Sequence, residues 1–287
     1  MIHMSGQEFI DLKPNLSAQH LTKIYGPSCE YCQDLQNELD KNVCPRCGSV
    51  HALRDVSLEV YPGEIVGIVG ESGSGKSTLM RSLYFDQNVD SGEMFLNAIK
   101  DGRVNVFDLS EQQKLKIKNN IFGMVYQNPY LGLRMNYSAL SNIAERQIAA
   151  GSRRVERMQT RALELLDRVN ILPSRSGEPP LNFSGGMQQR VQIAKALSSE
   201  PPILFLDEIT TGLDLSVQAQ VLDLILSIAH DLSISMLVVS HDLGVIRMLA
   251  HRCYVMLDGR VIEQGLTDQI LQDPQAVYTQ KLVYSLL

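Results

Sequence analysis

Apolar and polar positions alternate in blocks along the chain, and the first blocks predict strands. Alternation of period two in LSAQHLTKIYG, residues 16–26, indicates a half-buried strand near the start. Two apolar runs, Val56–Val60 and Glu64–Val69, predict two further strands joined by a turn at Pro62-Gly63. A Gly-rich loop follows, and the pattern then predicts a helix from about Lys76. The first part of the chain is therefore expected to be rich in strands.

The spacing of apolar residues changes in the middle of the chain and changes again after Pro180. Apolar residues recur at spacings of three and four in RALELLDRVNIL, so residues 110–182 are expected to be mostly helical. The later pattern predicts a helix, a buried strand, a second helix and a second strand, at Ser184–Leu197, Ile203–Leu206, from about Ser216, and Ile234–Val239. Alternating helices and strands predict an α/β core with a parallel sheet. We expect one such core, interrupted by a helical subdomain at 110–182 and carrying a small polar insert at 29–47.

Composition and charge narrow the class of protein. With 287 residues and 44% hydrophobic residues, the chain can bury a core, which excludes wholesale disorder. The net charge is −6, from 26 Lys plus Arg against 32 Asp plus Glu, and this disfavours nucleic acid as a partner. No run of 18 apolar residues and no apolar leader segment is visible, so we expect neither a membrane span nor a signal peptide. A cytoplasmic protein with reduced cysteines is expected.

A Gly-rich loop carries the clearest chemical signal. GESGSGKS, residues 70–77, fits G-x-x-x-x-G-K-[ST] and stands between a predicted strand and a predicted helix, the setting that this phosphate-binding motif requires. Its backbone N–H groups would surround phosphate oxygens, Lys76 would reach the β- and γ-phosphates, and Ser77 would ligate Mg²⁺. The predicted nucleotide-binding residues here are Gly70, Glu71, Ser72, Gly73, Ser74, Gly75, Lys76, Ser77 and Thr78.

Two adjacent acids complete the expected site. The apolar run Ile203–Leu206 ends abruptly in Asp207 and Glu208, and ligands bind at the carboxyl ends of parallel strands. Asp207 is expected to hold the Mg²⁺ shell, and Glu208 to orient or deprotonate the attacking water. The alternative is a strand that ends in solvated acids, which the neighbouring phosphate loop makes less attractive.

Between these motifs lies FSGGMQQR, residues 183–190. A glycine pair at the start of a helix offers backbone donors to a second anion, although Ser184 could simply cap the helix. Here the chain resembles the ATP-binding cassette ATPases over about residues 17–287, whose signature is usually LSGGQ. The resemblance implies a P-loop α/β fold with a RecA-like core, an antiparallel β portion and a helical subdomain. It also implies ATP hydrolysis with Mg²⁺.

The resemblance carries over to single positions. Tyr25 is similar to the aromatic residue that stacks on adenine, and Gln127 to the Q-loop glutamine that touches Mg²⁺ and the water. His241 resembles the switch histidine at the γ-phosphate, and Thr211–Asp214 resembles the D-loop. Taken singly, a tyrosine or histidine is more often a core or surface residue. In this family two cassettes form a head-to-tail dimer, in which each ATP contacts the other chain's signature segment, here Ser184, Gly185, Gly186 and Met187.

One position departs from the family, and two subfamilies compete. Ile209 stands where the family usually has proline, so the course of the following loop is less determined. The dipeptide and oligopeptide importer ATPases share GESGSGKST and DLSVQAQVLDLI with this chain. The ATPase subunit of the carbon–phosphorus lyase system also shares NPYLGLR, residues 128–134, together with FSGGMQQR and SHDLGV. The likeness to the carbon–phosphorus lyase subunit implies a soluble phosphonate-degrading complex as partner. The likeness to the importer ATPases implies a membrane permease.

Paired cysteines mark the insert. Cys29-x-x-Cys32 and Cys44-x-x-Cys47 have the pairing of a Cys₄ zinc knuckle, with an iron–sulfur cluster or no metal as alternatives. Four thiolates leave no open coordination position, so a zinc ion here would stiffen the insert. Both subfamilies have only a short loop at this place. We hypothesise that the insert docks a partner. Because it follows Tyr25, the residue expected to stack on adenine, an influence of the insert on nucleotide binding is a second hypothesis.

Overall fold

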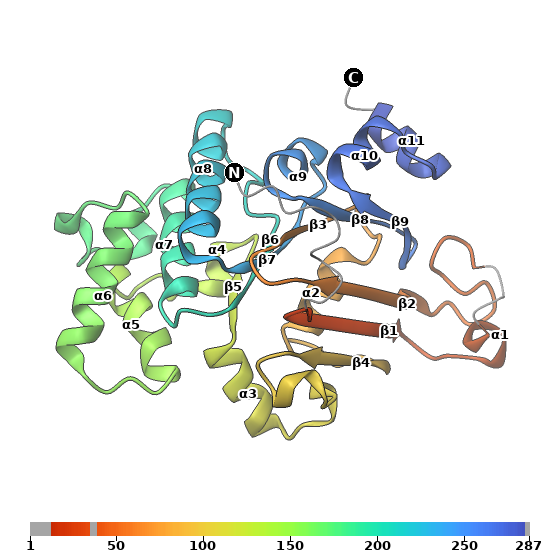
Figure 1. Cartoon of the computed structure of the whole chain (residues 1–287), viewed down its shortest axis with the longest axis horizontal. Coiled ribbons are helices and arrows are strands. Elements are labelled where there is room, and N and C mark those ends of the chain that lie inside the picture. Colours follow the sequence, from red (N-terminus) through yellow and green to blue (C-terminus); the bar gives the residue numbers. More distant parts are fainter. Residues whose placement is uncertain (1–12, 35–38, 285–287) are drawn as a thin grey trace.

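The computed structural model describes residues 13–34 and 39–284, so residues 1–12 of the predicted lead-in and 35–38 of the predicted insert lie outside the described part. Two sheets of different kinds form its framework (Figure 1). The smaller sheet is antiparallel and has the order β2-β1-β4, with bounds Val50–Val60, Leu16–Tyr25 and Ser91–Leu96. The first strand was predicted correctly. The second begins at Val50 rather than at the predicted Val56, because residues 51–54 are all buried and show no alternation.

The larger sheet has six strands in the order β5-β6-β7-β3-β8-β9. Their bounds are Phe122–Val125, Ile203–Asp207, Ser235–Val239, Ile65–Val69, Arg252–Leu257 and Arg260–Leu266. Neighbours are parallel except for β9, which runs antiparallel to β8. The predicted parallel α/β core is confirmed, and its carboxyl-terminal edge receives the ends of β3 and β6, where both predicted motifs begin.

Residues 110–182 contain a strand as well as helices. The helices are α3, α4, α5 and α6, at Glu111–Asn120, Pro129–Gly132, Ala139–Ala149 and Val155–Arg168. Strand β5 lies among them and pairs with β6 of the main sheet. Its four residues are all apolar and buried, and such a short run fits a buried helix as well as a strand. Helices α5, α6 and α7 (Gly185–Leu197) lie together at one end of the molecule, far from α1 (Glu30–Gln33) at the other end (Figure 1).

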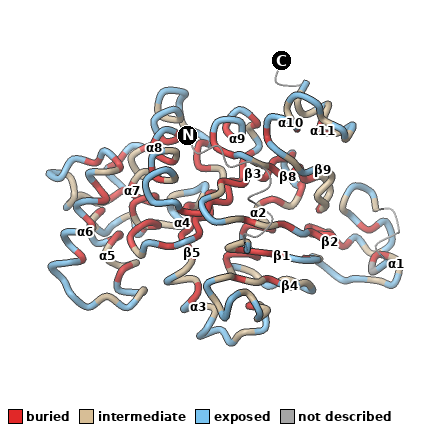
Figure 2. Tube along the Cα trace, in the orientation of Figure 1, coloured by how far each residue is buried: buried red, intermediate tan, exposed pale blue. Residues whose placement is uncertain are grey.

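Two cores form on the two faces of the large sheet. In β3, Ile65 and Val69 face one core, and Val66 and Ile68 face the other, as the two-residue period of a strand requires. The first core includes residues from α5, α6, α7 and α8 (Leu215–Leu232), and the second includes α2 (Lys76–Leu83) and the small sheet. Figure 2 shows the buried residues along the central strands and the exposed ones on the outer helices and turns.

The remaining elements complete the surface. They are the helices α9, α10 and α11, at Leu243–Leu249, Thr267–Gln272 and Val277–Tyr284, and 3₁₀ turns at Lys100–Gly102, Val106–Asp108, Pro173–Arg175 and Pro180–Asn182. Within residues 13–34 and 39–284, no helix combines the length and the apolar character that crossing a bilayer requires.

Candidate functional site

The phosphate loop joins β3 to α2 and is held from inside by its own lysine. Lys76 is 4% exposed, and its Nζ donates to the carbonyl oxygens of Gly70 and Glu71, both at 2.7 Å. Burial lowers the pKa of Lys76, while the charges of Glu208 and Asp207 act in the opposite direction. The amino group of Lys76 therefore lies inside the loop, within the electrostatic influence of two carboxylates.

Glycines let this loop approach two other strands. Gly75 has φ +105°, and a Cβ there would lie 2.2 Å from the Ala52 carbonyl oxygen on β2. A Cβ on Gly70, at φ +152°, would lie 2.2 Å from the Met256 carbonyl oxygen on β8. The loop is thus wedged between the small sheet and the large one.

The C-terminal helix also holds the loop. The hydroxyl of Tyr278, on α11, accepts a hydrogen bond of 2.8 Å from the backbone N–H of Glu71. The sequence pattern did not predict this contact of Tyr278, because it joins segments 207 residues apart. Chain folding alone brings them together.

Asp207 ends β6 as a buried carboxylate. Its Oδ1 is buried and has no hydrogen-bond partner among the described residues. Burial, with the neighbouring Glu208 charge, raises the pKa of Asp207 to about 6. A buried carboxylate oxygen with no protein donor suits a hard cation such as Mg²⁺, and so does the hydroxyl of Ser77, which lines the cavity above the loop together with Glu208, the residue after Asp207. The donor set therefore fits magnesium.

Three side chains converge on the Glu208 carboxylate. Gln127 Nε2 donates to Glu208 Oε2 at 2.9 Å, and the Thr211 hydroxyl donates to the same oxygen at 3.2 Å. His241 Nδ1 lies 3.3 Å from it. Glu208 itself has φ +44°, a strained value for a residue with a side chain, and such strain clusters at functional sites. The structure thus brings Gln127 and His241 to Glu208, and it adds Thr211, whose hydroxyl contact the sequence did not predict.

A cavity of about 250 Å³ opens above the loop. Among the predicted residues it is lined by Tyr25, Ser72, Gly73, Gly75, Lys76, Ser77, Thr78 and Glu208. Gly70, Glu71 and Ser74 belong to the loop but not to this lining. Asn42, Val50 and Ala52 also line it and were not predicted. Nothing in the pattern marks these three residues. Val50 and Ala52 lie on β2, and the His51 N–H of the same strand donates to the Asn42 carbonyl oxygen.

Tyr25 stands at the mouth of this cavity. Its side chain is 42% exposed, and its hydroxyl donates to Gln87 Oε1 at 2.8 Å. The hydrogen bond fixes the ring, while part of its surface stays accessible to a flat ligand.

The predicted signature segment, Ser184–Met187, lies outside the cavity of Lys76. Ser184 caps α7, and its hydroxyl accepts from the Met187 N–H at 3.4 Å. Gly186 packs against α8, where a Cβ would lie 2.3 Å from Val217 Cγ1. Ser184 and Gly185 are exposed, and neither they nor Gly186 and Met187 line the cavity of Lys76. Within one chain the two predicted anion-binding surfaces are therefore separate.

Ile209 follows the strained Glu208 and is 3% exposed. Its side chain belongs to the larger core, so packing anchors the start of this loop where the family has a proline ring.

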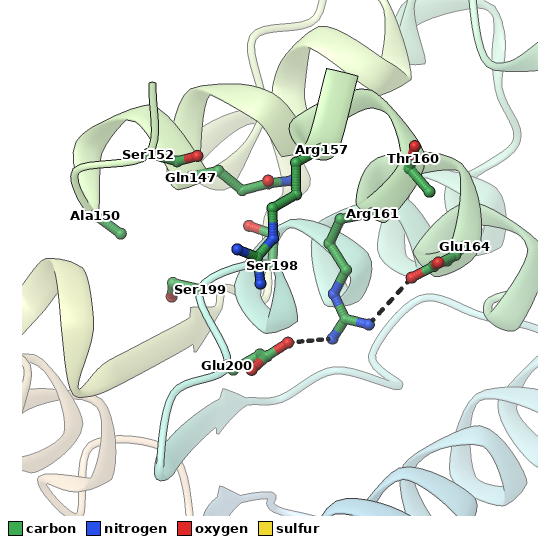
Figure 3. A pocket seen from close by; sticks show the side chains of 10 residues that line it. All are labelled: Gln147, Ala150, Ser152, Arg157, Thr160, Arg161, Glu164, Ser198, Ser199 and Glu200. Carbon is green, nitrogen blue, oxygen red and sulfur yellow. Dashed lines mark hydrogen bonds and ion pairs between the residues drawn. The ribbon is translucent and has the colours of Figure 1, made fainter. Parts of the chain in front are cut away.

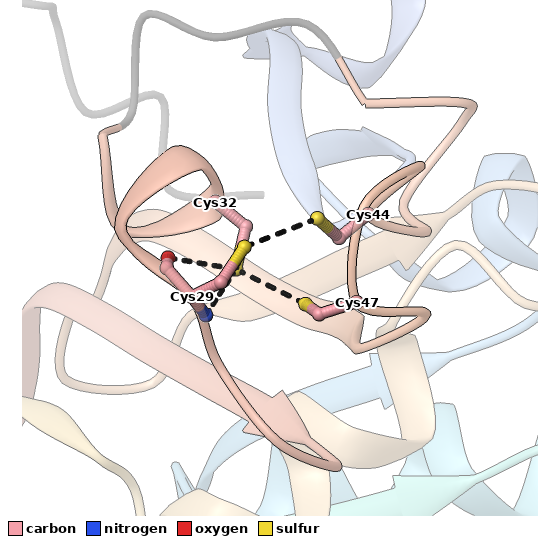
Figure 4. A group of neighbouring side chains, drawn as sticks. All are labelled: Cys29, Cys32, Cys44 and Cys47. Atoms are coloured by element: carbon pink, nitrogen blue, oxygen red, sulfur yellow. Dashed lines mark hydrogen bonds between the residues drawn. The ribbon is translucent and has the colours of Figure 1, made fainter.

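The insert gathers all four of its cysteines (Figure 4). Their sulfur atoms lie within 4.8 Å of one another, and the Cys29–Cys32, Cys29–Cys44 and Cys32–Cys47 separations are 3.7, 3.8 and 3.7 Å. Four thiolates bound at about 2.3 Å to one tetrahedral ion lie about 3.8 Å apart. The sulfur positions therefore suit a single metal ion, whereas an iron–sulfur cluster would need room for several iron atoms.

A second hollow of about 470 Å³ lies in the helical part of the molecule (Figure 3). Arg161 there pairs with Glu164 at 3.5 Å and with Glu200 at 3.2 Å. Its charge is thus compensated within the chain. None of the predicted nucleotide-site residues lines this hollow.

Comparisons with known proteins identify the family of this chain. The family model described as ABC transporter matches residues 53–211. The chain is 40% identical over 275 residues to the putative phosphonates utilization ATP-binding protein PhnK of Escherichia coli K12, covering 96% of this chain and 98% of that one. It is 38% identical to the putative peptide import ATP-binding protein BMEII0863 of Brucella melitensis, covering 84% and 73%.

A solved structure has the same fold. It is the dimeric post-hydrolysis state of the ATP-binding cassette MJ0796 bound to ADP and Pi, with a TM-score of 0.73 and 28% identity over 88% of this chain and 98% of that one. The phosphate loop, the strand-end carboxylates and the matched family together give one conclusion. The chain belongs to the ATP-binding cassette family of ATP-hydrolysing proteins.

Proposed function

We propose that this chain is the ATPase subunit of a soluble carbon–phosphorus lyase-like complex, in which ATP binding and hydrolysis drive a conformational change. The observation that carries the proposal is the 40% identity to the phosphonates utilization ATP-binding protein along nearly the whole of both chains. The peptide-import relatives match at a similar identity but over 73% of their length.

A membrane-importer motor is the second candidate, because relatives with peptide-import names are 38% identical. The two candidates differ in their partner and share the same ATP chemistry. Neither assigns substrate binding to this chain.

For the ATP chemistry we assign roles to the residues around Glu208. Lys76 and the loop N–H groups bind the β- and γ-phosphates, and Tyr25 stacks on the adenine ring. Glu208 accepts a proton from the attacking water, with Gln127 and His241 placed to orient the water and the γ-phosphate. Ser77, Asp207 and Gln127 would hold Mg²⁺, which would neutralise charge on the phosphates when bound. The orphaned Asp207 oxygen supports this assignment.

A second copy of the chain would supply the remaining contacts. The separation of the Ser184–Met187 segment from the Lys76 cavity, together with its exposed start, supports a head-to-tail dimer with two ATP molecules between the chains. The dimeric state named for MJ0796 supports a dimer.

We also assign Zn²⁺ to Cys29, Cys32, Cys44 and Cys47, because their sulfur spacing suits a tetrahedral ion with four thiolates. Its contribution would be structural.

The test of the partner is purification of the tagged chain from its native cell under mild conditions with ATP. We expect soluble subunits of a phosphonate-degrading complex to co-purify, as identified by mass spectrometry. Purification with the detergent-solubilised membrane fraction is the matched control, and integral permeases as the principal partners would overturn the proposal in favour of the importer.

A further inference from the structure

The cysteine insert and the nucleotide cavity share one strand. After the second cysteine pair the chain passes through Ser49 directly into β2, and Val50 and Ala52 of β2 line the cavity. The carbonyl oxygen of Ala52 lies against Gly75 of the phosphate loop. A change in the insert therefore has a short covalent path to the loop.

Hydrogen bonds tie the metal ligands to the start of this strand. Cys44 N–H donates to the Ser49 carbonyl oxygen at 2.8 Å, and the Ser49 hydroxyl lies 3.2 Å from the Cys47 sulfur. The same hydroxyl lies 3.3 Å from His51 Nε2 on β2. Ser49 is fully buried and His51 is 1% exposed, so the contacts form part of a packed interior. Groups that hydrogen-bond to metal ligands orient those ligands.

One residue of the insert reaches the cavity itself. Asn42 lies two positions before Cys44, and its carbonyl oxygen accepts from the His51 N–H at 2.7 Å. Its side-chain Nδ2 donates to the Gly73 carbonyl oxygen at 3.4 Å, and Asn42 lines the cavity together with Tyr25 and Lys76. The amide is therefore positioned both by the insert and by the phosphate loop.

The residues from 39 to 49 bury few side chains. Among residues 39–49 only Cys44 and Ser49 are buried, although backbone hydrogen bonds join Asp40 to Val43 and Asn42 to His51. A segment this short cannot offset its own ordering entropy with so little buried surface. A metal ion bound by four thiolates would provide that free energy.

We propose that the metal bound by the four cysteines sets the nucleotide affinity of the cavity, by holding Asn42 against the phosphate loop where its amide contacts the bound nucleotide. The inference rests on the proposed ATP site and on the proposed zinc site, and it adds a regulatory link between them. Loss of the metal would free Asn42 and the start of β2, and the cavity would lose one wall.

The experiment measures zinc content and affinity for a fluorescent ATP analogue on the same full-length preparations. Wild-type protein should hold about one zinc ion per chain, by elemental analysis. Asn42→Ala should keep the zinc and bind nucleotide roughly three- to tenfold more weakly, because it loses one hydrogen-bonding group. The double variant Cys44→Ser/Cys47→Ser should lose the zinc and bind at least as weakly. Asn120→Ala, an exposed amide on α3, is the matched control and should bind like the wild type.

A combined variant tests whether the two effects share a route. If the insert acts through Asn42, adding Asn42→Ala to the double cysteine variant should weaken binding little further. Zinc-free wild-type protein, prepared with a chelator, should behave like the cysteine variant and recover on adding Zn²⁺.

The results that would contradict this inference differ from those that would contradict the proposed function. Wild-type protein without zinc, or nucleotide affinity unchanged in Asn42→Ala and in zinc-free protein, would overturn the inference and leave the ATP site standing. Unchanged affinity with loss of a co-purifying partner in the cysteine variant would point to the insert as a docking element instead. Failure of the zinc-loaded wild type to bind the ATP analogue at all would overturn the proposed function itself.

Discussion

At the scale of single residues, Glu208 has the side chains of Gln127, Thr211 and His241 at one of its carboxylate oxygens. We predict that Glu208→Gln lowers the rate of ATP hydrolysis about 10²- to 10⁴-fold, because the amide cannot accept a proton from water. Nucleotide affinity should be retained, because the amide keeps the size of the carboxyl group. Phosphate release and nucleotide titration measure the two quantities. Glu93→Gln, an exposed acid on β4, is the control, and a wild-type rate in the Glu208→Gln variant would exclude the proton-acceptor role.

Asp207 gives a pH prediction at the same scale. Its pKa in the folded protein is about 6, above the ordinary 3.8, so the folded state favours the protonated form. The stability that this form contributes is fully present below about pH 4 and is lost as the pH rises through 6. Asp207→Asn is neutral at every pH, and nucleotide-free protein with this change should therefore melt above the wild type at pH 8. The gap should narrow as the pH falls to 5.

Thermal unfolding without Mg²⁺ and nucleotide checks this expectation. Asp223→Asn removes an exposed carboxylate of α8 and should show no such pH-dependent gap. An Asp207→Asn variant less stable than the wild type at pH 8 would contradict the picture of an uncompensated buried charge.

At the scale of elements, Arg252 joins the small sheet to the large one. From β8 it binds Glu64 at 2.9 Å, the Tyr254 hydroxyl at 2.9 Å and the Glu59 carbonyl oxygen of β2 at 2.8 Å. The side chains of Arg252 and Glu64 are only 23% and 12% exposed, so the pair is poorly screened. We predict that Arg252→Met lowers the free energy of unfolding by about 2–3 kcal/mol, because Glu64 is left without its partner.

Urea unfolding of Arg252→Met beside Arg168→Met provides the comparison. Arg168 pairs with Asp231 at the surface, with 29% and 49% of the two side chains exposed, and its loss should change the free energy by less than about 1 kcal/mol. Equal effects of the two substitutions would show that the junction of the sheets does not depend on this ion pair.

At the scale of the whole molecule, the Ser184–Met187 segment does not line the cavity of Lys76 within one chain, and the proposed head-to-tail dimer would bring the two surfaces together. Gly185 is exposed, and the nearest atom to a Cβ there is Leu213 Cδ2 at 3.8 Å, so a large side chain fits without disturbing the monomer. We predict that Glu208→Gln protein dimerises on adding ATP, and that a further Gly185→Trp change prevents this. Light scattering after size-exclusion chromatography measures the mass. Glu93→Trp is the control on a distant strand, and dimers that survive Gly185→Trp would contradict the head-to-tail arrangement.

Local patterns determined much of this protein. The loop G-x-x-x-x-G-K-S between a strand and a helix, the apolar strand ending in Asp207 and Glu208, and the paired cysteines each place their chemistry within a few neighbouring residues. Such motifs can be recognised in the sequence because, within one turn or one strand, the number of residues between two positions determines the distance between them. The strands and helices around these motifs followed from periodicity or from apolar runs bounded by turn residues, whereas the four apolar residues of β5, within a mostly helical stretch, did not distinguish a strand from a helix.

Tertiary structure alone decided the contacts between segments distant in the chain. The sheet order brings Gln127 and His241 to Glu208, and β2 carries Ala52 to the phosphate loop and donates from its His51 N–H to Asn42. Tyr278 reaches Glu71 from the far end of the chain. These contacts depend on strand pairing and on helix packing, which arise from the burial of apolar surface over the whole molecule and leave no local trace in the sequence.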